Sequence, residues 1–249
     1  MKRGSDRRGD IADLAGSVGL GALAAFAVLT MVVVGGDGAP LFTDDALSGW
    51  SLAHRPVMAV ASARGLTATG TGVVPYALAV LAGIVAGRTL RHRLLAAALS
   101  LCCLVSGQAV RYGVMTLVAR PRPPRLDWHT HASGWAYPSG HSTTAACTAG
   151  LLVLAIFLRG PRGRTLLAVV IGCWGVLVGL TRVYLGVHWF TDVAGGWLLS
   201  VGWLGLCLCA AASWLPDRFI TGITNTATAP PLEGHAPQDP SCRGRSRPA

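Results

Sequence analysis

The sequence predicts an all-α, polytopic membrane protein with six transmembrane helices. Hydrophobic residues make up 52% of the 249 residues and charged residues only 13%, whereas about a quarter of a typical soluble domain is charged. The apolar residues also occur in long blocks rather than at amphipathic spacing, and a membrane span needs about 20 of them. The lipid bilayer is therefore the first partner that the sequence indicates.

The apolar blocks define six expected spans, which follow one another along most of the chain. Their ranges are 14–34, 73–87, 94–118, 142–158, 165–181 and 190–215. The segment 41–71 has mixed polarity, so an interfacial helix and a loop are expected between the first two spans. The charged start resembles that of a signal peptide, but the apolar block behind it is long enough to be a retained anchor.

Three parts of the chain follow from this pattern. Residues 1–13 form a charged N-terminal segment, and residues 14–215 form one six-span domain. Residues 216–249 are rich in Pro, Thr, Ser and Gly, a composition that predicts a disordered tail.

The basic residues predict the orientation, because Lys and Arg concentrate on the cytoplasmic side of membrane proteins. With the N-terminus inside, fourteen of the 21 basic residues face the cytoplasm. They are Lys2, Arg3, Arg7, Arg8, Arg88, Arg91, Arg93, Arg159, Arg162, Arg164, Arg218, Arg243, Arg245 and Arg247. We therefore expect a multi-pass protein of the cell (plasma) membrane with both termini in the cytoplasm. The net charge of +10 is spread over separate loops without interleaved aromatics, which argues against nucleic acid as a partner.

Three polar segments stand at the ends of spans, at residues 120–123, 138–141 and 181–192. The first follows the third span, the second opens the fourth, and the last joins the fifth to the sixth. The order of the spans therefore brings all three to one membrane face, which the basic residues place outside the cell.

The last segment contains a histidine and a carboxylate at helical spacing. His188 and Asp192 are four residues apart, so we expect them on one face of a helix, with the carboxylate accepting a hydrogen bond from the imidazole. The other ring nitrogen is then free to act as a nucleophile. Gly186 is expected to break the chain, so that Arg182 comes from the fifth span and His188 from the sixth. The alternative is an interfacial His–Asp pair beside a membrane-anchoring tryptophan.

The second segment, Pro-Ser-Gly-His, opens a predicted helix. Gly140 permits close backbone approach, and exposed amides at a helix start bind phosphate oxygens. His141 follows, placed to protonate a leaving oxygen. The alternative is an ordinary helix start capped by Ser139.

Arginines dominate the first segment. Arg120 and Arg122 flank a proline, and their guanidinium groups suit phosphate oxygens, although arginines at membrane ends also meet lipid headgroups. Arg111 lies about two turns inside the third span, where a charge is costly and usually functional.

Together the three segments resemble the type-2 phosphatidic acid phosphatase and vanadium haloperoxidase superfamily, in its membrane lipid phosphatase branch. That family's pattern is Lys-x6-Arg-Pro, Pro-Ser-Gly-His and Ser-Arg-x5-His-x3-Asp. The second motif is intact here, and the third has Thr181 in place of serine. The first lacks its lysine, because Met115 occupies that position, and Arg111 one turn earlier is a candidate replacement. The resemblance covers residues 44–215.

The resemblance implies a role for each site residue. His188 would be the nucleophile that forms a phosphohistidine, Asp192 would orient it, and His141 would be the general acid and then the base. The phosphate contacts would come from further residues, with no metal and no cofactor. These are Arg122, Arg182, Ser139 and Gly140. Two further phosphate contacts are expected from the residues themselves, Arg120 from its guanidinium group beside a proline and Arg111 as the candidate replacement for the lysine.

The resemblance thus implies a metal-independent phosphatase for a lipid phosphate or pyrophosphate, with its active site outside the cell. Candidate substrates are an isoprenyl pyrophosphate, phosphatidic acid, a phosphatidylglycerol phosphate or a prenyl-linked sugar phosphate. A phosphotransferase of the same family and a non-enzymatic lipid-binding or transport protein remain alternatives, and the sequence indicates no oligomeric state. A haloperoxidase is the least favoured reading, because vanadate binding in that branch relies on the absent lysine.

Overall fold

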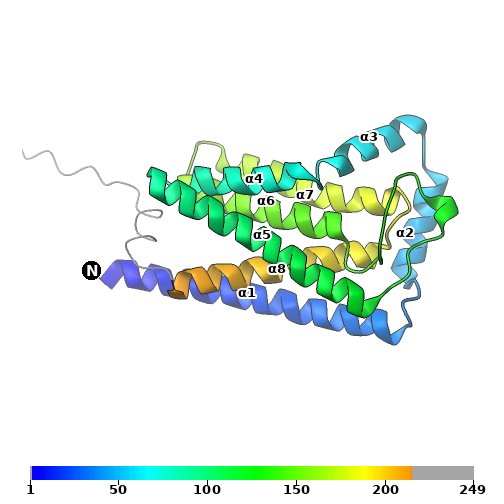
Figure 1. Ribbon diagram of the computed structural model, residues 1–249, viewed down its shortest axis with the longest axis horizontal. Coiled ribbons are helices and arrows are strands. Elements are labelled where there is room, and N and C mark those ends of the chain that lie inside the picture. Colours follow the sequence, from blue (N-terminus) through cyan, green and yellow to red (C-terminus); the bar gives the residue numbers. More distant parts are fainter. Residues whose placement is uncertain (1, 215–249) are drawn as a thin grey trace, which may run out of the picture.

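In the computed structural model, which describes residues 2–214, the regular elements are all helices (Figure 1). They are α1 (Lys2–Gly35), α2 (Phe42–Ala53), α3 (Val57–Ala68), α4 (Val73–Ala86), α5 (Leu90–Val118), the 3₁₀ turn Arg125–Asp127, α6 (Gly140–Arg159), α7 (Arg164–Tyr184) and α8 (Phe190–Trp214). The predicted tail at 216–249 and the predicted last residue of the sixth span lie outside the described residues.

Five of these helices are long and apolar enough to cross a membrane, namely α1 from Ala12 onward, α5, α6, α7 and α8. The pair α3 and α4 passes the same test together, although the two are bent by 52° at the break between them, and counting that pair as one gives six spans. The predicted all-helical, multi-pass fold class is confirmed.

The structure differs from the prediction between the first two spans. The segment 41–71 contains two helices, α2 and α3, rather than one helix and a loop. The break between α3 and α4 falls at a pair of glycines, of which Gly72 has a φ of +65°, a conformation that favours glycine. If the pair is one span, that span begins earlier than its apolar block, in helix α3, whose apolar sequence includes Arg64.

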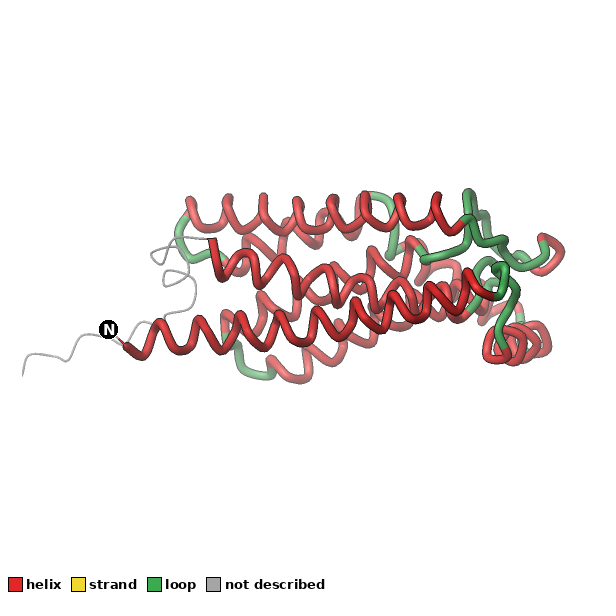
Figure 2. Tube along the Cα trace, turned by 90° about the horizontal axis from the view of Figure 1, so that it is seen from below, coloured by secondary structure: helices red, strands yellow, loops and turns green. Residues whose placement is uncertain are grey.

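The spanning helices run side by side along the long axis, and α2 lies across one end of them (Figures 1 and 2). Helix α6 is central, because it contacts α4, α5, α7 and α8 and 56% of its apolar window is buried, the largest share among the spans. The N-terminal residues 2–13 belong to α1, so the helix begins before its apolar span, which starts at Ala12.

Helices α1 and α8 pack together through glycines. A Cβ atom on Gly19 would lie 2.9 Å from the Cα atom of Gly205, and one on Gly202 would collide with Leu23. Small residues let membrane helices approach closely where no hydrophobic effect drives them together. The contact holds the first span against the last.

All three motif loops lie at the end of the bundle that α2 crosses (Figure 1). The loop before α6 is fixed there by Tyr137, which is fully buried. Its ring stacks on Phe26 at 5.9 Å, and its hydroxyl lies 2.8 Å from Thr30 Oγ1. Burial raises the pKa of Tyr137 to about 12, so the phenol stays protonated at neutral pH.

Replacing Gly205 with valine should separate α1 from α8. The new methyl groups would meet the backbone of Gly19, and overpacking of this kind costs about 1–3 kcal/mol. We expect the thermal unfolding midpoint in detergent to fall. The matched control is Gly21→Val, because a Cβ atom at Gly21 meets nothing within 4 Å. Equal losses in the two variants would contradict the packing account.

Candidate active site

The motif loops enclose a cavity of about 400 Å³. Its lining comes from α5, from the loop before α6, from the start of α6, from α7 and from the loop before α8. The lining residues are Arg111, Tyr112, Met115, Arg122, His131, Ala132, Ser133, Gly134, Gly140, His141, Arg182 and His188. Three arginines and three histidines are thus present, and among residues 2–214 no carboxylate lines the cavity, which therefore favours an anion.

The turn between α7 and α8 brings His188 to this cavity. Helix α7 ends at Tyr184, and Gly186 has a φ of +74°. A side chain at Gly186 would also collide with the carbonyl of Asp127, so glycine is required twice over. The predicted break between the fifth and sixth helices at Gly186 is confirmed.

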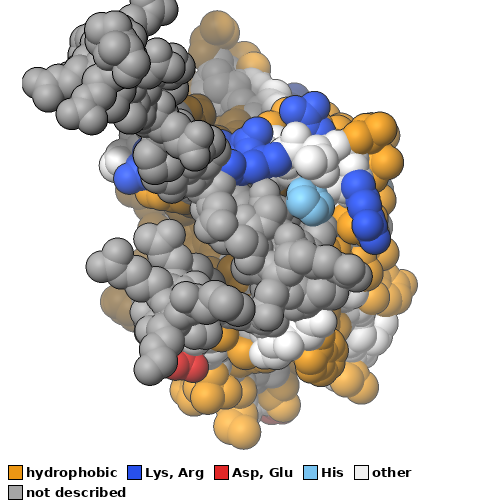
Figure 3. All heavy atoms as spheres, turned by 90° about the vertical axis from the view of Figure 1, so that its left-hand side faces the viewer, with side chains coloured by type: hydrophobic (Ala, Val, Ile, Leu, Met, Phe, Trp, Pro, Cys, Tyr) orange, Lys and Arg blue, Asp and Glu red, His pale blue; other side chains and the backbone are white. Residues whose placement is uncertain are grey.

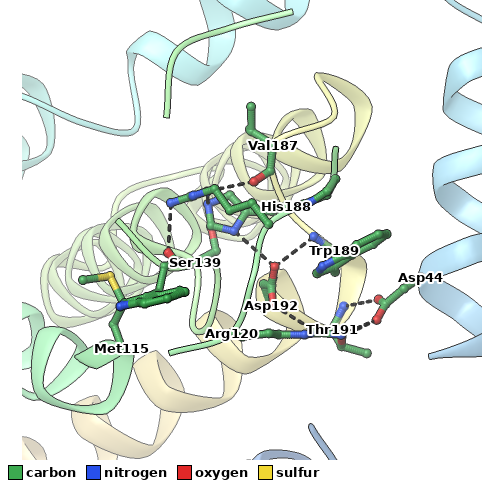
Figure 4. A network of polar contacts seen from close by, with 12 residues as sticks. Asp44, Met115, Arg120, Ser139, Val187, His188, Trp189, Thr191 and Asp192 are labelled. Atoms are coloured by element: carbon green, nitrogen blue, oxygen red, sulfur yellow. Dashed lines mark hydrogen bonds and ion pairs between the residues drawn. The ribbon is translucent and has the colours of Figure 1, made fainter. Parts of the chain in front are cut away.

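The expectation that His188 and Asp192 share a helical face is wrong. His188 lies in the loop before α8, and Asp192 is the third residue of that helix. The carboxylate of Asp192 reaches back to accept the backbone N–H of Trp189 at 2.8 Å, as acidic residues do at helix starts. The same oxygen lies 3.3 Å from His188 Nδ1, so the two residues meet by a different route (Figure 4).

The contacts of His188 assign its tautomer. Its Nε2 atom lies 2.9 Å from Nη1 of Arg122, and a guanidinium can only donate. The lone pair is therefore on Nε2, and Nδ1 carries the hydrogen that points to Asp192. Burial, with the nearby charges of Arg122 and Arg182, holds the pKa of His188 well below its usual range. The imidazole is neutral at neutral pH.

Arg182 presents an unused donor at the cavity. The residue is 2% exposed, and its Nη1 atom donates to Thr67 Oγ1 at 3.2 Å. Its buried Nε atom has no hydrogen-bond partner among the described residues. A buried donor without an acceptor is costly, and the side chain that carries it lines the cavity.

The start of α6 offers further donors. The first amides of a helix have no partner within the helix, and the side chain of Ser139 makes no capping bond in the described structure. Gly140 and His141 are both in the cavity wall. The alternative of a helix start capped by the Ser139 side chain is therefore wrong. Ser139 is itself fully buried and is not part of the lining, so its phosphate contact stays a prediction.

Arg111 reaches the cavity across Met115. Its Nε atom donates to Gln108 Oε1 at 3.0 Å, and its Nη1 atom lies 3.4 Å from the sulfur of Met115. A Cβ atom on Gly140 would lie 3.5 Å from the Arg111 guanidinium carbon. The guanidinium group thus stands beside the start of α6, at the tip of the residue that replaces the family lysine.

Arg122 is held by the loop that forms one wall of the cavity. Its Nε and Nη2 atoms donate to the carbonyls of Ser133, Gly134 and Trp135 at 2.8–3.0 Å. Its Nη1 atom donates to the Val187 carbonyl at 2.7 Å and also faces His188. Burial lowers the pKa of Arg122. This arginine therefore links the loop before α6 to the nucleophile candidate.

The structure corrects the prediction that Arg120 contacts phosphate. Its side chain is fully buried and does not line the cavity. Its Nη1 atom donates to Asp192 Oδ1 at 2.7 Å and its Nη2 atom to Asp44 Oδ2 at 2.9 Å. The physical reason is that two buried carboxylates require a cation between them (Figure 4).

Several residues of this site were missed by sequence reasoning. They are Asp44, Thr67, Gln108 and Thr191. The only sequence signal for Asp44 is its seven-residue spacing from Ser51, which places both on the buried face of α2. In residues 2–214 no group of three or more His, Cys, Asp or Glu side chains is arranged to hold a metal ion.

Several known proteins resemble this chain in sequence or in fold. Residues 93–215 match the PAP2 superfamily. A phosphatidylglycerophosphatase B from Bacillus subtilis (strain 168) is 39% identical over 74 residues, which cover 28% of this chain and 36% of the relative. Its counterpart from Escherichia coli (strain K12) is 36% identical over 107 residues, covering 43% and 39%. An undecaprenyl-diphosphatase from Sulfolobus acidocaldarius is 31% identical over 102 residues, covering 39% and 44%.

The chain thus spans about two fifths of the length of these curated relatives. A solved structure extends the likeness to most of the fold, with a TM-score of 0.63, 26% identity and coverage of 76% of this chain and 94% of the other. It is described as the first transmembrane PAP2 type phosphatidylglycerolphosphate phosphatase, from Bacillus subtilis. The family match and the likeness of the fold together show that residues 93–215 carry a PAP2 superfamily domain.

Proposed function

We propose that this protein is an integral-membrane phosphatase that hydrolyses a lipid phosphate or lipid pyrophosphate through a phosphohistidine intermediate. One observation carries the proposal. The Nε2 lone pair of the neutral His188 faces a cavity lined by arginines and by the open start of α6. A nucleophile and a phosphate-binding site therefore share one space.

In the first step, Nε2 of His188 attacks phosphorus and the bond from phosphorus to the lipid-side oxygen breaks. His141 protonates that oxygen. Nδ1 keeps its hydrogen and donates it in a hydrogen bond to Asp192, whose carboxylate stabilises the imidazolium that forms. Arg182 and the amides at the start of α6 hold the non-bridging oxygens as charge spreads over them.

In the second step, His141 removes a proton from water, which attacks phosphorus and releases His188 and inorganic phosphate. The Nη1 atom of Arg122 occupies the nucleophile's lone pair in the free protein. When phosphate binds, this Nη1 atom must turn from His188 to a phosphate oxygen. Arg122 then makes its predicted phosphate contact, and Nε2 is free to attack. The guanidinium groups supply the positive charge, so the mechanism has no step that requires a metal.

The substrate class is supported by the relatives and by the place of the cavity. The relatives are named as phosphatases of phosphatidylglycerophosphate and undecaprenyl diphosphate, both lipids with a terminal phosphate. The cavity lies at one end of the spanning helices, beside the half-exposed Tyr112 of α5. An amphiphile can place its phosphate there while its tail stays in the bilayer.

We place the active site on the extracytoplasmic face. The opposite end of the bundle carries the α4–α5 and α6–α7 connections, with Arg88 and Arg162 among their basic residues. Basic side chains are visible among apolar ones on that end (Figure 3). Lys and Arg concentrate on the cytoplasmic side of membrane proteins, so these basic residues support a cytoplasmic location for this end of the bundle and for both termini.

Replacing His188 with alanine should abolish phosphate release. The test compares wild type and His188→Ala on several lipid phosphates and pyrophosphates in detergent, with EDTA present. We expect a loss of more than about 1000-fold, because the nucleophile is removed. The exposed His54 provides a control, and His54→Ala should retain wild-type activity. Activity that survives His188→Ala, or disappears with EDTA, would contradict the proposal. Substrate consumed without an equal yield of inorganic phosphate would indicate a phosphotransferase.

Arg111 should stand in for the missing lysine. We expect Arg111→Gln to lower kcat/KM by about 10²–10³-fold, as removal of one transition-state donor does. Adding Met115→Lys to that variant should restore part of the activity, because Met115 lies against the Arg111 guanidinium. The control is Arg125→Gln, an exposed arginine of the same outer end. Wild-type kcat/KM in Arg111→Gln would show that the cation is not used.

A further inference from the structure

A chain of buried charges runs from α2 to the nucleophile candidate. Asp44 lies 2.9 Å from Arg120, Arg120 lies 2.7 Å from Asp192, and Asp192 lies 3.3 Å from His188. None of these residues is more than 4% exposed. Asp44, Arg120 and Asp192 are not among the residues that line the cavity, and Figure 4 shows how they follow one another.

Asp44 is fully engaged by this chain. Its Oδ2 atom accepts hydrogen bonds from Arg120, from the Thr191 hydroxyl at 2.7 Å and from the backbone N–H of Leu41 at 3.0 Å. Its Oδ1 atom accepts the backbone N–H of Thr191 at 2.8 Å. Asp44 therefore binds the first turn of α8 at Thr191, the residue before Asp192.

The two carboxylates share one guanidinium. Arg120 donates one terminal nitrogen to Asp44 and the other to Asp192 and the Thr191 hydroxyl. The rotation of its planar fork is thus fixed at both sides, and so is the oxygen of Asp192 that it contacts. Two backbone carbonyls also hold the guanidinium, because Nε donates to Gly38 at 3.2 Å and Nη2 to Ala39 at 3.0 Å. Without Asp44, Arg120 would lose one of its two carboxylate partners, and its full charge would fall on Asp192.

The link from Asp192 to His188 is the longest of the chain. A small rotation of the carboxylate is therefore enough to lose it, because this distance is already at the long end for an N–H···O hydrogen bond, and such bonds weaken steeply as their angle departs from linear. The orientation of Asp192 decides whether Nδ1 of His188 keeps its hydrogen and whether Nε2 keeps its lone pair. The support behind Asp192 is consequently part of the nucleophile's geometry.

We propose that Asp44 and Arg120 are positioning residues, which hold Asp192 in the orientation that activates His188. The inference rests on the proposed function and adds to it residues that lie outside the catalytic groups. It also gives α2 a role in catalysis, because this helix across the outer end of the bundle supplies Asp44. A purely structural cross-brace between α2 and α8 is the competing account.

The test replaces Asp44 with asparagine, which keeps the shape and removes the charge. We expect kcat to fall about 10–100-fold, the effect typical of losing a group that orients a functional histidine through its carboxylate partner, with KM within about two-fold of wild type. Trapped phosphohistidine should form correspondingly more slowly. The matched control is Asp45→Asn, the exposed neighbour in the same turn, which should leave kcat unchanged.

A second comparison asks whether Asp44 acts through Arg120. Combining Asp44→Asn with Arg120→Met should lower kcat no further than Arg120→Met alone, because residues that act through one another are not additive. A structural brace predicts a lower unfolding temperature with kcat unchanged. Wild-type kcat in Asp44→Asn, or fully additive losses, would overturn the proposal.

If Asp44→Asn does not fold, Thr191→Val takes its place. This change removes one hydroxyl that donates to Asp44 and accepts from Arg120, and wild-type kcat in it would also overturn the proposal. Failure of the proposed function and failure of the positioning role give different results. An inactive wild-type protein would remove the proposed function, whereas an active wild type with inactive His188→Ala and fully active Asp44→Asn would remove only the positioning role.

Discussion

The rest of the site depends on the ion pairs that Arg120 makes with Asp44 and Asp192. They tie together three parts of the chain that are distant in sequence, namely α2, the loop after α5 and the start of α8. All three side chains are fully removed from water. A buried pair that loses one partner leaves an uncompensated charge, at a cost of about 3–5 kcal/mol. The polar end of the bundle is therefore arranged so that each of these charges meets its partner.

From this support the chemistry follows in short steps. Asp192 holds the Nδ1 side of His188, and the low pKa of that histidine keeps the other nitrogen unprotonated. Arg111 and Arg182 reach the same cavity from α5 and α7. Positive charge is thus concentrated around the cavity that we propose for phosphate, while His188, the proposed nucleophile, stays neutral. Burial has both effects, because it strengthens the attraction between the arginines and an anion and disfavours the charged form of His188.

The sequence predicted the parts of this arrangement that depend on local pattern. Apolar block lengths located the spans, and the order of the spans brought the motifs to one end. Gly186 marked the turn because its backbone conformation suits glycine. The predictions that were wrong concern residues whose neighbours come from distant segments of the chain. Nothing local distinguishes Arg120 from Arg122, and only the packing of α2 shows that one is buried between carboxylates. The His188–Asp192 spacing suggested a helix, whereas capping of α8 produced the contact.

The central claim is that Nε2 of His188 and the arginines around it form one phosphate site. The most direct measurement is a structure of the wild-type protein with orthovanadate, which mimics phosphate during transfer. The account predicts vanadium bonded to Nε2 of His188, with its oxygens facing Arg182, Arg111 and the start of α6. Vanadate held elsewhere, with Nε2 still contacting only Arg122, would contradict it.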